Sequence, residues 1–593
     1  MTPRARTLLF FLLALAAILP FLPALNAPFL DWDDMFNLVE NERWRGLTHA
    51  NIRWMLTTLY GGPYQPLSWL SYAFDFTLWG AHPSAMRMTN LFLHALSAVL
   101  LCLVVESLIE RASPGSAPRE RASASVFAAL FWAIHPLRVE SVCWLTERRD
   151  VLSGFFYLLA VYLYVRRRGG MLGPFIAFNL AVLSKASAIT LPLTLLILDA
   201  WPLDRLRRER RATVLEKIPY LAVSIATGLA GLAGQKAAGT LKGLATAGLG
   251  ERLAMAAHSL WWYMAKTVWP ADLSPYHRVP PGFGLGSPVV WGASAAVLAV
   301  GGLAWAARRR APAAPAAALH YALALAPMAG LARFGHHLVA ERYCYLPGLG
   351  LAALAGAGLL CARRRAAWRT PAGAAAVAVL IAFSAMSARG AAYWRGNEAL
   401  WRRVLAVDPD SNLARINLAS FLRREKRLDE ALELERAAAA RDPLLFEQLN
   451  NLGADAVRKN NFTEGEGYLR AALAAKPDFA TARYNLAGAL DGLGRTADAL
   501  AELKKAARLD ASNPDIANNL GLALLSAGKA NAAEKELRWA LMLNPSRPST
   551  VYNWGNALSA LGRHQEAAAA YDRAVRLDPR FTQAWINGGN ALA

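Results

Sequence analysis

One asparagine recurs every 34 residues through the last third of the chain. It stands at Asn417, Asn451, Asn485, Asn519, Asn553 and Asn587. The surrounding residues agree from unit to unit, as in ARYNLAGALDGLG and VYNWGNALSALG, and a second apolar segment follows in each unit. Because a repeat of this length holds one pair of helices that cannot bury its apolar face alone, the sequence predicts a stacked α-helical solenoid.

This repeat resembles the tetratricopeptide repeat, a 34-residue helix–turn–helix unit. Alanines mark a matching position in the second helix of five units: Ala438, Ala472, Ala506, Ala540 and Ala574. We expect five units and a truncated sixth helix over residues 412–593, with a lead-in helix over residues 391–411. The resemblance implies that the first helices of the units line a concave groove.

The repeated asparagines, here called the asparagine column, allow two interpretations. They are common at this position of such repeats, where they support the turn of the helix pair. Alternatively, their amides pair with the backbone of an extended peptide, because a primary amide both donates and accepts hydrogen bonds. The column resembles the asparagine ladder of the nucleocytoplasmic O-linked N-acetylglucosamine transferase. That resemblance predicts acceptor-peptide binding by the whole column.

The first 390 residues are typical of a membrane domain. The chain of 593 residues is 55% hydrophobic, and eleven apolar segments between residues 7 and 388 are candidate membrane spans. The first of them is interpreted as a retained span rather than a cleaved signal peptide. We therefore expect an all-α protein: a polytopic membrane domain of about 11 spans over residues 1–390, with an outer loop at 26–85, followed by the solenoid.

Charge patterning predicts the orientation. The net charge of +21 comes largely from short arginine runs between apolar segments, which is an orientation signal rather than a nucleic-acid surface. Eleven spans place these runs in the cytoplasm and the repeats outside. The segment Leu253 to Trp269 breaks the alternation and is rich in tryptophan, so we expect an interfacial or re-entrant helix on the outer face.

Unusual polar residues gather on the predicted outer face. The acid loop, residues 29–34, follows the first span and holds three carboxylates in four residues, Asp31, Asp33 and Asp34. The same face receives acids, histidines and cations from distant segments: His135, Arg138, Glu140, Glu147, Arg148, Arg149, Asp150, Lys185, His277, Arg278, His336, His337, Glu341 and Arg342. Anchoring needs only simple arginine runs, whereas a polar active site needs such a mixture.

Five motifs in this order carry a wider resemblance: FLDWDDMFNLVEN, PLSWLSYAFDFTLWG, HPLRVESVCWLTERRDVLSG, LSKASAITLPLTLLILDAWPL and ERYCYLPGLG. Together they resemble the transmembrane and tetratricopeptide-repeat-containing proteins and their bacterial relatives. This resemblance implies a multi-span glycosyltransferase of the C fold that takes sugar from a polyprenyl phosphate. Animal members are described as O-mannosyltransferases, and the sugar does not carry over. Gln65 departs from the family pattern, where histidine is more usual.

Site roles follow from this resemblance and from the chemistry of the transfer. A carboxylate is the natural base for an attacking hydroxyl, so Asp33 or Asp34 is expected to be catalytic, with Asp31 the weaker candidate. Fixed cations would stabilise the leaving phosphate. The candidates for that role are Arg148, Arg149, Lys185, Arg342, His336 and His337, and each could instead form a structural ion pair or contact a lipid headgroup. The expected supporting residues are His135, Glu140, Glu147, Asp150 and Glu341.

Several chemistries lack a sequence signature. The four cysteines form no Cys-x-x-Cys pair, so neither a disulfide framework nor a zinc site is expected. Acids and histidines converge without fixed ligand spacing, so no obligatory metal is predicted, and a divalent metal is left open. Phosphate-loop and dinucleotide fingerprints are absent from the sequence, which argues against a nucleotide sugar as direct substrate.

The sequence therefore predicts a glycosyltransferase of the bacterial inner membrane. It would move a sugar, mannose being one candidate, from a polyprenyl phosphate to Ser or Thr of exported proteins that bind the repeats in an extended form. Two alternatives remain: a non-enzymatic membrane scaffold, and a transferase that acts on a lipid or envelope glycan.

Overall fold

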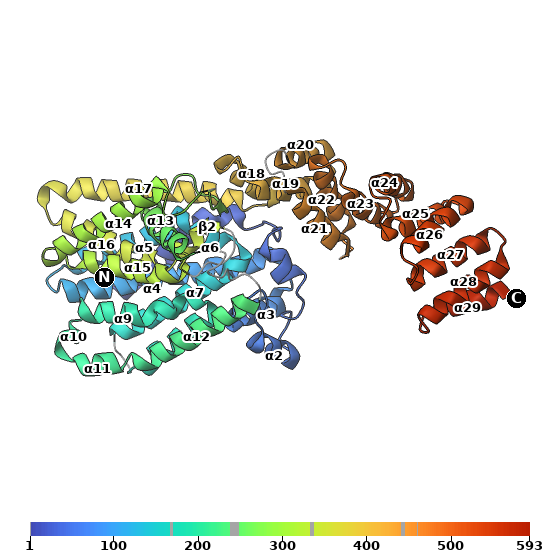
Figure 1. Ribbon diagram of the computed structural model, residues 1–593. Coiled ribbons are helices and arrows are strands. Elements are labelled where there is room, and N and C mark those ends of the chain that lie inside the picture. The colour runs from blue at the N-terminus through green and yellow to red at the C-terminus, as the bar shows by residue number, and fades with distance from the viewer. Residues whose placement is uncertain are drawn as a thin grey trace. The chain divides into compact units, whose positions relative to one another are not determined.

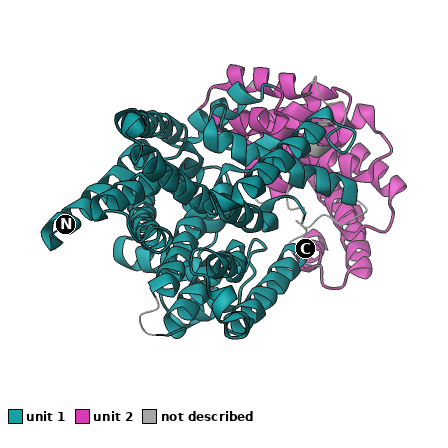
Figure 2. Cartoon of the chain, turned by 90° about the vertical axis from the view of Figure 1, so that its left-hand side faces the viewer, with its two compact units in different colours: residues 1–409 teal, residues 410–593 magenta. Residues whose placement is uncertain are grey.

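The computed structural model describes residues 2–166, 170–237, 248–280, 282–331, 337–439, 445–458 and 460–592. The chain divides into two compact units, unit 1 at Met1–Pro409 and unit 2 at Asp410–Ala593 (Figure 2). Helices dominate both units (Figure 1).

Unit 1 is built around the long helix α4, Pro83–Ala112, which packs against α1, α5 and α7. A proline in the first turn of α4 suits the helix start, where its missing N–H would have no helical partner. The α-helices of unit 1 are α1 Pro3–Ile18, α2 His49–Thr57, α3 Pro66–Trp79, α4, α5 Pro118–Ala133, α6 Val139–Cys143, α7 Arg148–Arg166, α8 Leu172–Ser184, α9 Leu191–Ala200, α10 Arg205–Arg208, α11 Arg210–Leu215, α12 Ile218–Ala237, α13 Leu249–Val268, α14 Pro288–Ala306, α15 Ala313–Leu325, α16 Gly348–Arg363, α17 Arg369–Tyr393 and α18 Asn397–Val407.

Short helical turns connect these helices and carry much of the polar chemistry. They are η1 Leu19–Ala24, η2 Met35–Val39, η3 Pro136–Arg138, η4 Leu145–Glu147, η5 Ala186–Thr190, η6 Ala307–Arg309, η7 Ala326–Met328, η8 Glu341–Cys344 and η9 Ala366–Trp368. Two short strands, β1 His277–Arg278 and β2 His337–Val339, pair antiparallel, with His277 opposite Val339. The all-α prediction missed this ribbon, because two- and three-residue strands show no alternation of apolar and polar residues.

Five helical segments in the described residues are long and apolar enough to cross a membrane: Pro3–Ala24, Pro83–Ala112, Arg210–Ala237, Pro288–Arg309 and Ala366–Tyr393. A sixth is a bent pair, Pro118–Ala133 with Pro136–Cys143, broken by 57°. Four further apolar helices are shorter: Leu172–Ser184, Ala186–Ala200, Ala313–Met328 and Gly348–Arg363. Such helices are typical of a membrane protein, and the count of eleven spans stays a prediction.

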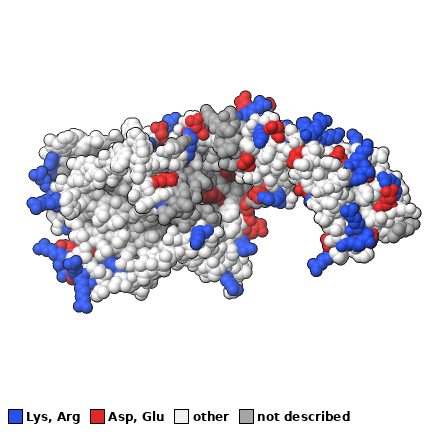
Figure 3. Space-filling view, viewed as in Figure 1, with Lys and Arg blue, Asp and Glu red and all other residues white. Residues whose placement is uncertain are grey.

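The surface of unit 1 agrees with this composition. Lys and Arg side chains gather at the end that holds α10 and α11, and most of the other surface of unit 1 in this view is uncharged (Figure 3). Large apolar side chains are exposed on several candidate spans, among them Phe11, Leu298 and Ile381. In a bilayer such side chains would face lipid rather than water.

Unit 2 consists of paired helices. The pairs are α19 Asn412–Arg424 with α20 Leu428–Ala439, α21 Leu445–Arg458 with α22 Phe462–Ala475, α23 Ala480–Gly492 with α24 Thr496–Leu509, α25 Pro514–Ser526 with α26 Ala530–Leu543, and α27 Pro548–Ala560 with α28 His564–Leu577. A single helix, α29 Thr582–Leu592, follows them. The helix α18 lies in the segment predicted to lead into the repeats and belongs to unit 1.

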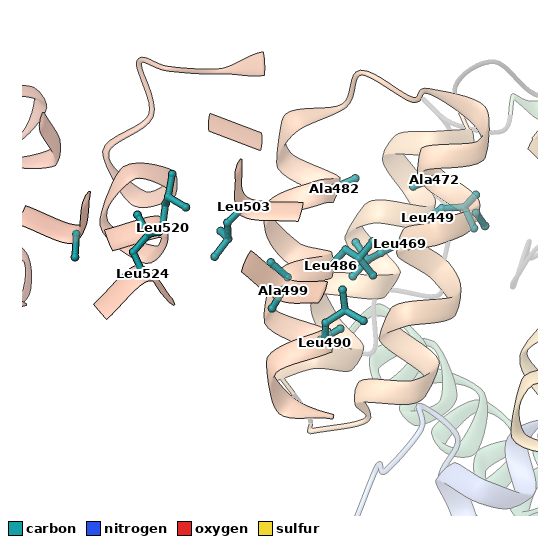
Figure 4. Packing of buried hydrophobic residues seen from close by; sticks show 14 of the residues in the cluster. Leu449, Leu469, Ala472, Ala482, Leu486, Leu490, Ala499, Leu503, Leu520 and Leu524 are labelled. Carbon is teal, nitrogen blue, oxygen red and sulfur yellow. The ribbon is translucent and has the colours of Figure 1, made fainter. Parts of the chain in front are cut away.

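Leucines and alanines fill the core between the paired helices (Figure 4). Leu449, Leu469, Leu486 and Leu490 interdigitate, and the alanine of each second helix is fully buried where helices cross. Close approach also needs glycine: a Cβ on Gly521 would lie 2.5 Å from Leu537 Cγ. The residues that recur every 34 positions are therefore those that pack the helices together.

Candidate functional site

The acid loop is tied down by its last residue, Asp34. The buried Asp34 carboxylate accepts hydrogen bonds from Leu30 N at 3.2 Å and from Thr146 N and Oγ1 at 3.0 and 2.7 Å. Burial raises the pKa of Asp34, and the hydrogen bonds from Thr146 and Leu30 act against that rise. These contacts join the acid loop to η4 and suit Asp34 for holding the loop in place.

Asp33, the residue before Asp34, is exposed. Protein atoms around the carboxylate remove part of its hydration, and this desolvation raises its pKa. The positive charges of Arg149 and Arg342 lower the pKa, and the negative charge of Glu147 raises it. A carboxylate can reach water and still be surrounded by protein when it stands at the edge of a polar recess. Asp33 thus combines access to water with a raised pKa, and both properties favour a role as a general base.

Glu147 is the centre of a group of ion pairs. Its buried carboxylate receives Arg149 Nε at 3.1 Å, Lys185 Nζ at 2.8 Å and Arg342 Nε at 3.2 Å. Burial alone would raise the pKa of Glu147, but these three cations together hold it well below its usual range. Glu147 therefore stays ionised and fixes the three cations around one point.

Two further carboxylates complete what we call the charge cluster, Glu140, Glu147, Asp150, Arg149, Lys185 and Arg342. Glu140 pairs with Arg342 Nη1 and accepts from its backbone N at 2.9 Å. Asp150 accepts from Lys185 Nζ at 2.7 Å and from Ser141 Oγ at 3.0 Å. The three cations keep 17, 10 and 12% of their side-chain surface exposed, for Arg149, Lys185 and Arg342. They are positioned in advance and remain accessible.

The structure places Arg148 away from the charge cluster. Its guanidinium is fully buried and pairs with Asp75 at 2.7 Å, and it also donates to Asn90 Oδ1 at 2.5 Å and Ser71 Oγ at 3.0 Å. Consecutive residues of a helix point about 100° apart, so Arg148 faces α3 and α4 while Arg149 faces the charge cluster. Arg148 is enclosed by protein and cannot reach a donor phosphate in this conformation.

His135, His337 and Glu341 form hydrogen bonds with groups outside this cluster. His135 Nδ1 accepts from Leu137 N at 3.1 Å, so the ring caps η3, and its Nε2 bonds to Thr267 O at 3.0 Å. His337 Nε2 contacts Tyr343 Oη at 2.8 Å, and His336 falls outside the described residues. Glu341 accepts from Ser274 N at 2.5 Å, and burial raises its pKa to about 8.

Sequence reasoning missed the aromatic residues beside the acid loop. Trp32 stacks on Trp401, with ring centroids 4.9 Å apart and planes 4° apart, and it meets Trp144 edge-on at 5.7 Å. Trp144 in turn lies 5.4 Å from the Arg342 guanidinium. The available signal was that Trp32 and Trp144 lie within two of the five sequence motifs, whereas Trp401 of α18 lies in none of them. Among the described residues there is no group of three or more His, Cys, Asp or Glu side chains that could hold a metal.

The asparagine column connects neighbouring repeats. Asn485 donates to Asn450 Oδ1 at 2.9 Å and Asn553 to Asn518 Oδ1 at 3.0 Å, whereas Asn519 donates to Tyr484 Oη at 3.1 Å. Asn587 likewise donates to Tyr552 Oη, 35 residues earlier. Asn417 bonds to its own helix at Leu413 O, and Asn451 is exposed. The column supports stacking. Asn485, Asn519 and Asn553 each donate one N–H to the neighbouring repeat, and the second N–H of these amides can serve another partner.

Comparison with known proteins finds one repeat family and several partial relatives. A family model described as tetratricopeptide repeat matches residues 385–445, 450–514, 518–580 and 552–593. The human protein O-mannosyl-transferase TMTC3 is 28% identical over 106 residues, which cover 18% of this chain and 10% of that protein. Human TMTC1, also a protein O-mannosyl-transferase, is 30% identical over 166 residues, 26% of this chain and 18% of that protein. The chain thus matches less than a fifth of the length of these relatives.

Among solved structures, YrrB, described as a TPR protein with an unusual peptide-binding site, is 20% identical with a TM-score of 0.24 and covers 31% of this chain and 95% of its own. MamA is 26% identical with a TM-score of 0.23 and covers 24% of this chain and 82% of its own. The chain carries tetratricopeptide repeats and has partial, low-identity homology to protein O-mannosyl-transferases.

Proposed function

We propose that this protein is a membrane glycosyltransferase that moves a sugar from a polyprenyl phosphate to a Ser or Thr hydroxyl of an exported protein. The observation that carries the proposal is the exposed Asp33 carboxylate, which feels the charges of Arg149 and Arg342, two of the three cations fixed on Glu147. The partial homology to protein O-mannosyl-transferases supports the transfer of sugar to protein.

The proposed reaction uses these groups in one displacement. Asp33 takes the proton of the acceptor hydroxyl as its oxygen forms a bond to the anomeric carbon. The bond from that carbon to the phosphate oxygen breaks, and the electron pair leaves with the lipid phosphate. The donors of Arg149, Lys185 and Arg342 that do not bind carboxylates stabilise the added negative charge. Asp34 holds the loop, and Glu147, Glu140 and Asp150 orient the cations.

The rest of the chain would supply the two substrates. The apolar helices of unit 1 are suited to a lipid-linked donor, and the repeats of unit 2 are suited to an extended acceptor. The column would then contact the acceptor backbone through the amide atoms that the inter-repeat bonds leave available. This proposal places the protein in the bacterial inner membrane with the repeats on the periplasmic side. The sugar is left open, with mannose the first candidate to test.

The test is intact-protein mass of exported proteins from cells that express the wild type, Asp33→Asn or Glu42→Gln. Glu42 is an exposed acid of the same outer loop and serves as the matched control. We expect sugar adducts with the wild type and with the control, and a loss of about a hundredfold or more with Asp33→Asn at equal protein level. Undiminished adducts with Asp33→Asn would refute the catalytic assignment. Sugar found only on lipid or envelope glycan would show that the acceptor is that lipid or glycan and not a protein.

A further inference from the structure

A pocket of about 290 Å³ lies at the C-terminal end of α17, entirely within unit 1. The last two turns of α17 form one wall, through Met386, Arg389, Gly390 and Tyr393. These residues are spaced three, four and seven positions after the first, so they share one helix face. The loop after α13, residues 270–275, and Arg403 of α18 form other walls. We call this space the α17 pocket.

Two guanidinium groups line the α17 pocket. Arg403 is fixed in place: its Nε donates to Leu273 O at 2.9 Å and its guanidinium lies 4.9 Å from the centre of the Tyr393 ring. Its terminal nitrogens have no hydrogen-bond partner among the residues that the structure describes. Arg389 is exposed and makes no ion pair within that same part of the chain. The pocket therefore offers guanidinium donors from two helices, α17 and α18, and such donors suit a phosphate group.

The pocket also carries one exposed carboxylate. Asp272 lies in the left-handed backbone region, with φ at 54°, and has no ion-pair partner among the described residues. The second acid of the lining, Glu341, is buried, and its raised pKa leaves it largely protonated at neutral pH. Two cations and one anion suit a ligand that has a phosphate and also a positively charged group.

The position of the pocket indicates where such a ligand comes from. The segment Ala366–Tyr393 is one of the candidate membrane spans, and little of it is buried inside the protein. Its last two turns would therefore lie at the level of the lipid headgroups. Tyr393 and Trp394 of the pocket wall are residue types enriched at that level. Basic pockets beside membrane helices are known sites for lipid headgroups.

We propose that the α17 pocket binds the headgroup of a phosphoethanolamine-type glycerophospholipid. Its phosphate lies between Arg389 and Arg403, and its ammonium group donates hydrogen bonds to Asp272. A headgroup that lacks the ammonium cannot use Asp272, and a quaternary ammonium has no N–H to donate. The bound lipid would link the end of α17, the loop after α13 and α18. The inference depends on α17 crossing the membrane and is independent of the transferase activity.

The test uses the full chain purified in a neutral detergent. Thermal unfolding and native mass spectrometry are measured with added phosphatidylethanolamine, phosphatidylglycerol, phosphatidylcholine or inorganic phosphate. We expect phosphatidylethanolamine to bind most tightly and to raise the unfolding temperature most. Arg389→Gln should weaken it at least tenfold. Asp272→Asn should weaken phosphatidylethanolamine binding to the level of phosphatidylglycerol binding. Asparagine tolerates the positive φ of this position, so the backbone should be unchanged. Arg369→Gln, an exposed arginine at the opposite end of α17, should leave binding unchanged.

Three results would overturn the proposal. One is equal binding of the three lipids by the wild-type protein. Another is unchanged phosphatidylethanolamine affinity in Arg389→Gln. The third is stabilisation by inorganic phosphate that equals that of the lipid, because it would make the pocket a site for a free anion. None of these measurements uses sugar transfer, so the outcome is separate from that for Asp33.

Discussion

The charge cluster of unit 1 and the asparagine column of unit 2 position polar side chains in opposite ways. In the charge cluster, one carboxylate holds cations from α7, from the residue before η5 and from η8, which are far apart in the chain. In the column, Asn485, Asn519, Asn553 and Asn587 each donate to a residue 35 positions earlier. The column repeats its contact in several units, so loss of one asparagine should leave the other contacts intact. The charge cluster is a single site, so loss of one residue affects the whole site.

The largest expected effect separates the neighbours Arg148 and Arg149. Arg148→Met leaves Asp75 buried without its cation and should lower the free energy of unfolding by about 3–5 kcal/mol. Arg149→Met removes a partly exposed cation and should cost much less stability while it lowers transfer activity. Thermal unfolding of both variants in detergent measures the difference. Equal losses of stability would show that the two arginines have the same environment.

Within the repeats, two glycines make a matched pair. A Cβ on Gly521 lies 2.5 Å from Leu537, so Gly521→Ala should destabilise unit 2 by about 1–3 kcal/mol through overpacking. A Cβ on Gly488 has its nearest neighbour at 3.8 Å, so Gly488→Ala should stabilise α23 by about 0.5–1 kcal/mol. Far-ultraviolet circular dichroism during heating of the full chain reports both. The same sign for both changes would contradict the packing of these helix pairs.

The pH dependence of transfer tests the environment of Asp33. Its raised pKa means that activity, which needs the ionised base, should fall as pH decreases through a value above that of an ordinary aspartate. Below that pKa the rate should drop about tenfold per pH unit. The measurement is the rate of sugar transfer to a peptide against pH. A rate that stays flat down to the usual aspartate range would argue that Asp33 is not the base.

The smallest expected effect lies in the asparagine column. Asn485→Ala removes the bond to Asn450 and should lower stability by about 0.5–1.5 kcal/mol. Asn417→Ala is the comparison, because Asn417 bonds only within its own helix among the described residues and should have little effect on repeat stacking. Peptide binding by both variants would separate stacking from recognition. A larger loss of stability in Asn417→Ala than in Asn485→Ala would contradict the role of the inter-repeat hydrogen bond.

The sequence predicted the helix pairs of unit 2 well, because each packing position recurs in every repeat. Ala472 and Leu486 are buried for the same reason as their counterparts in neighbouring units. The convergence of Arg149, Lys185 and Arg342 on one site followed from the expected topology and the family resemblance. The opposite burial of Asp33 and Asp34 could not be predicted, because it depends on where Thr146 lies in three dimensions.

The central claim is that the acid loop and the repeats share one aqueous compartment. It is tested by labelling intact cells with a membrane-impermeant thiol reagent, using single cysteines in place of exposed Glu42, Arg576 or Arg208 and with the native exposed Cys361 replaced. We predict labelling of the Glu42 and Arg576 positions from outside and of the Arg208 position only after permeabilisation. Labelling of the Glu42 position from outside, with the Arg576 position protected until permeabilisation, would contradict the account.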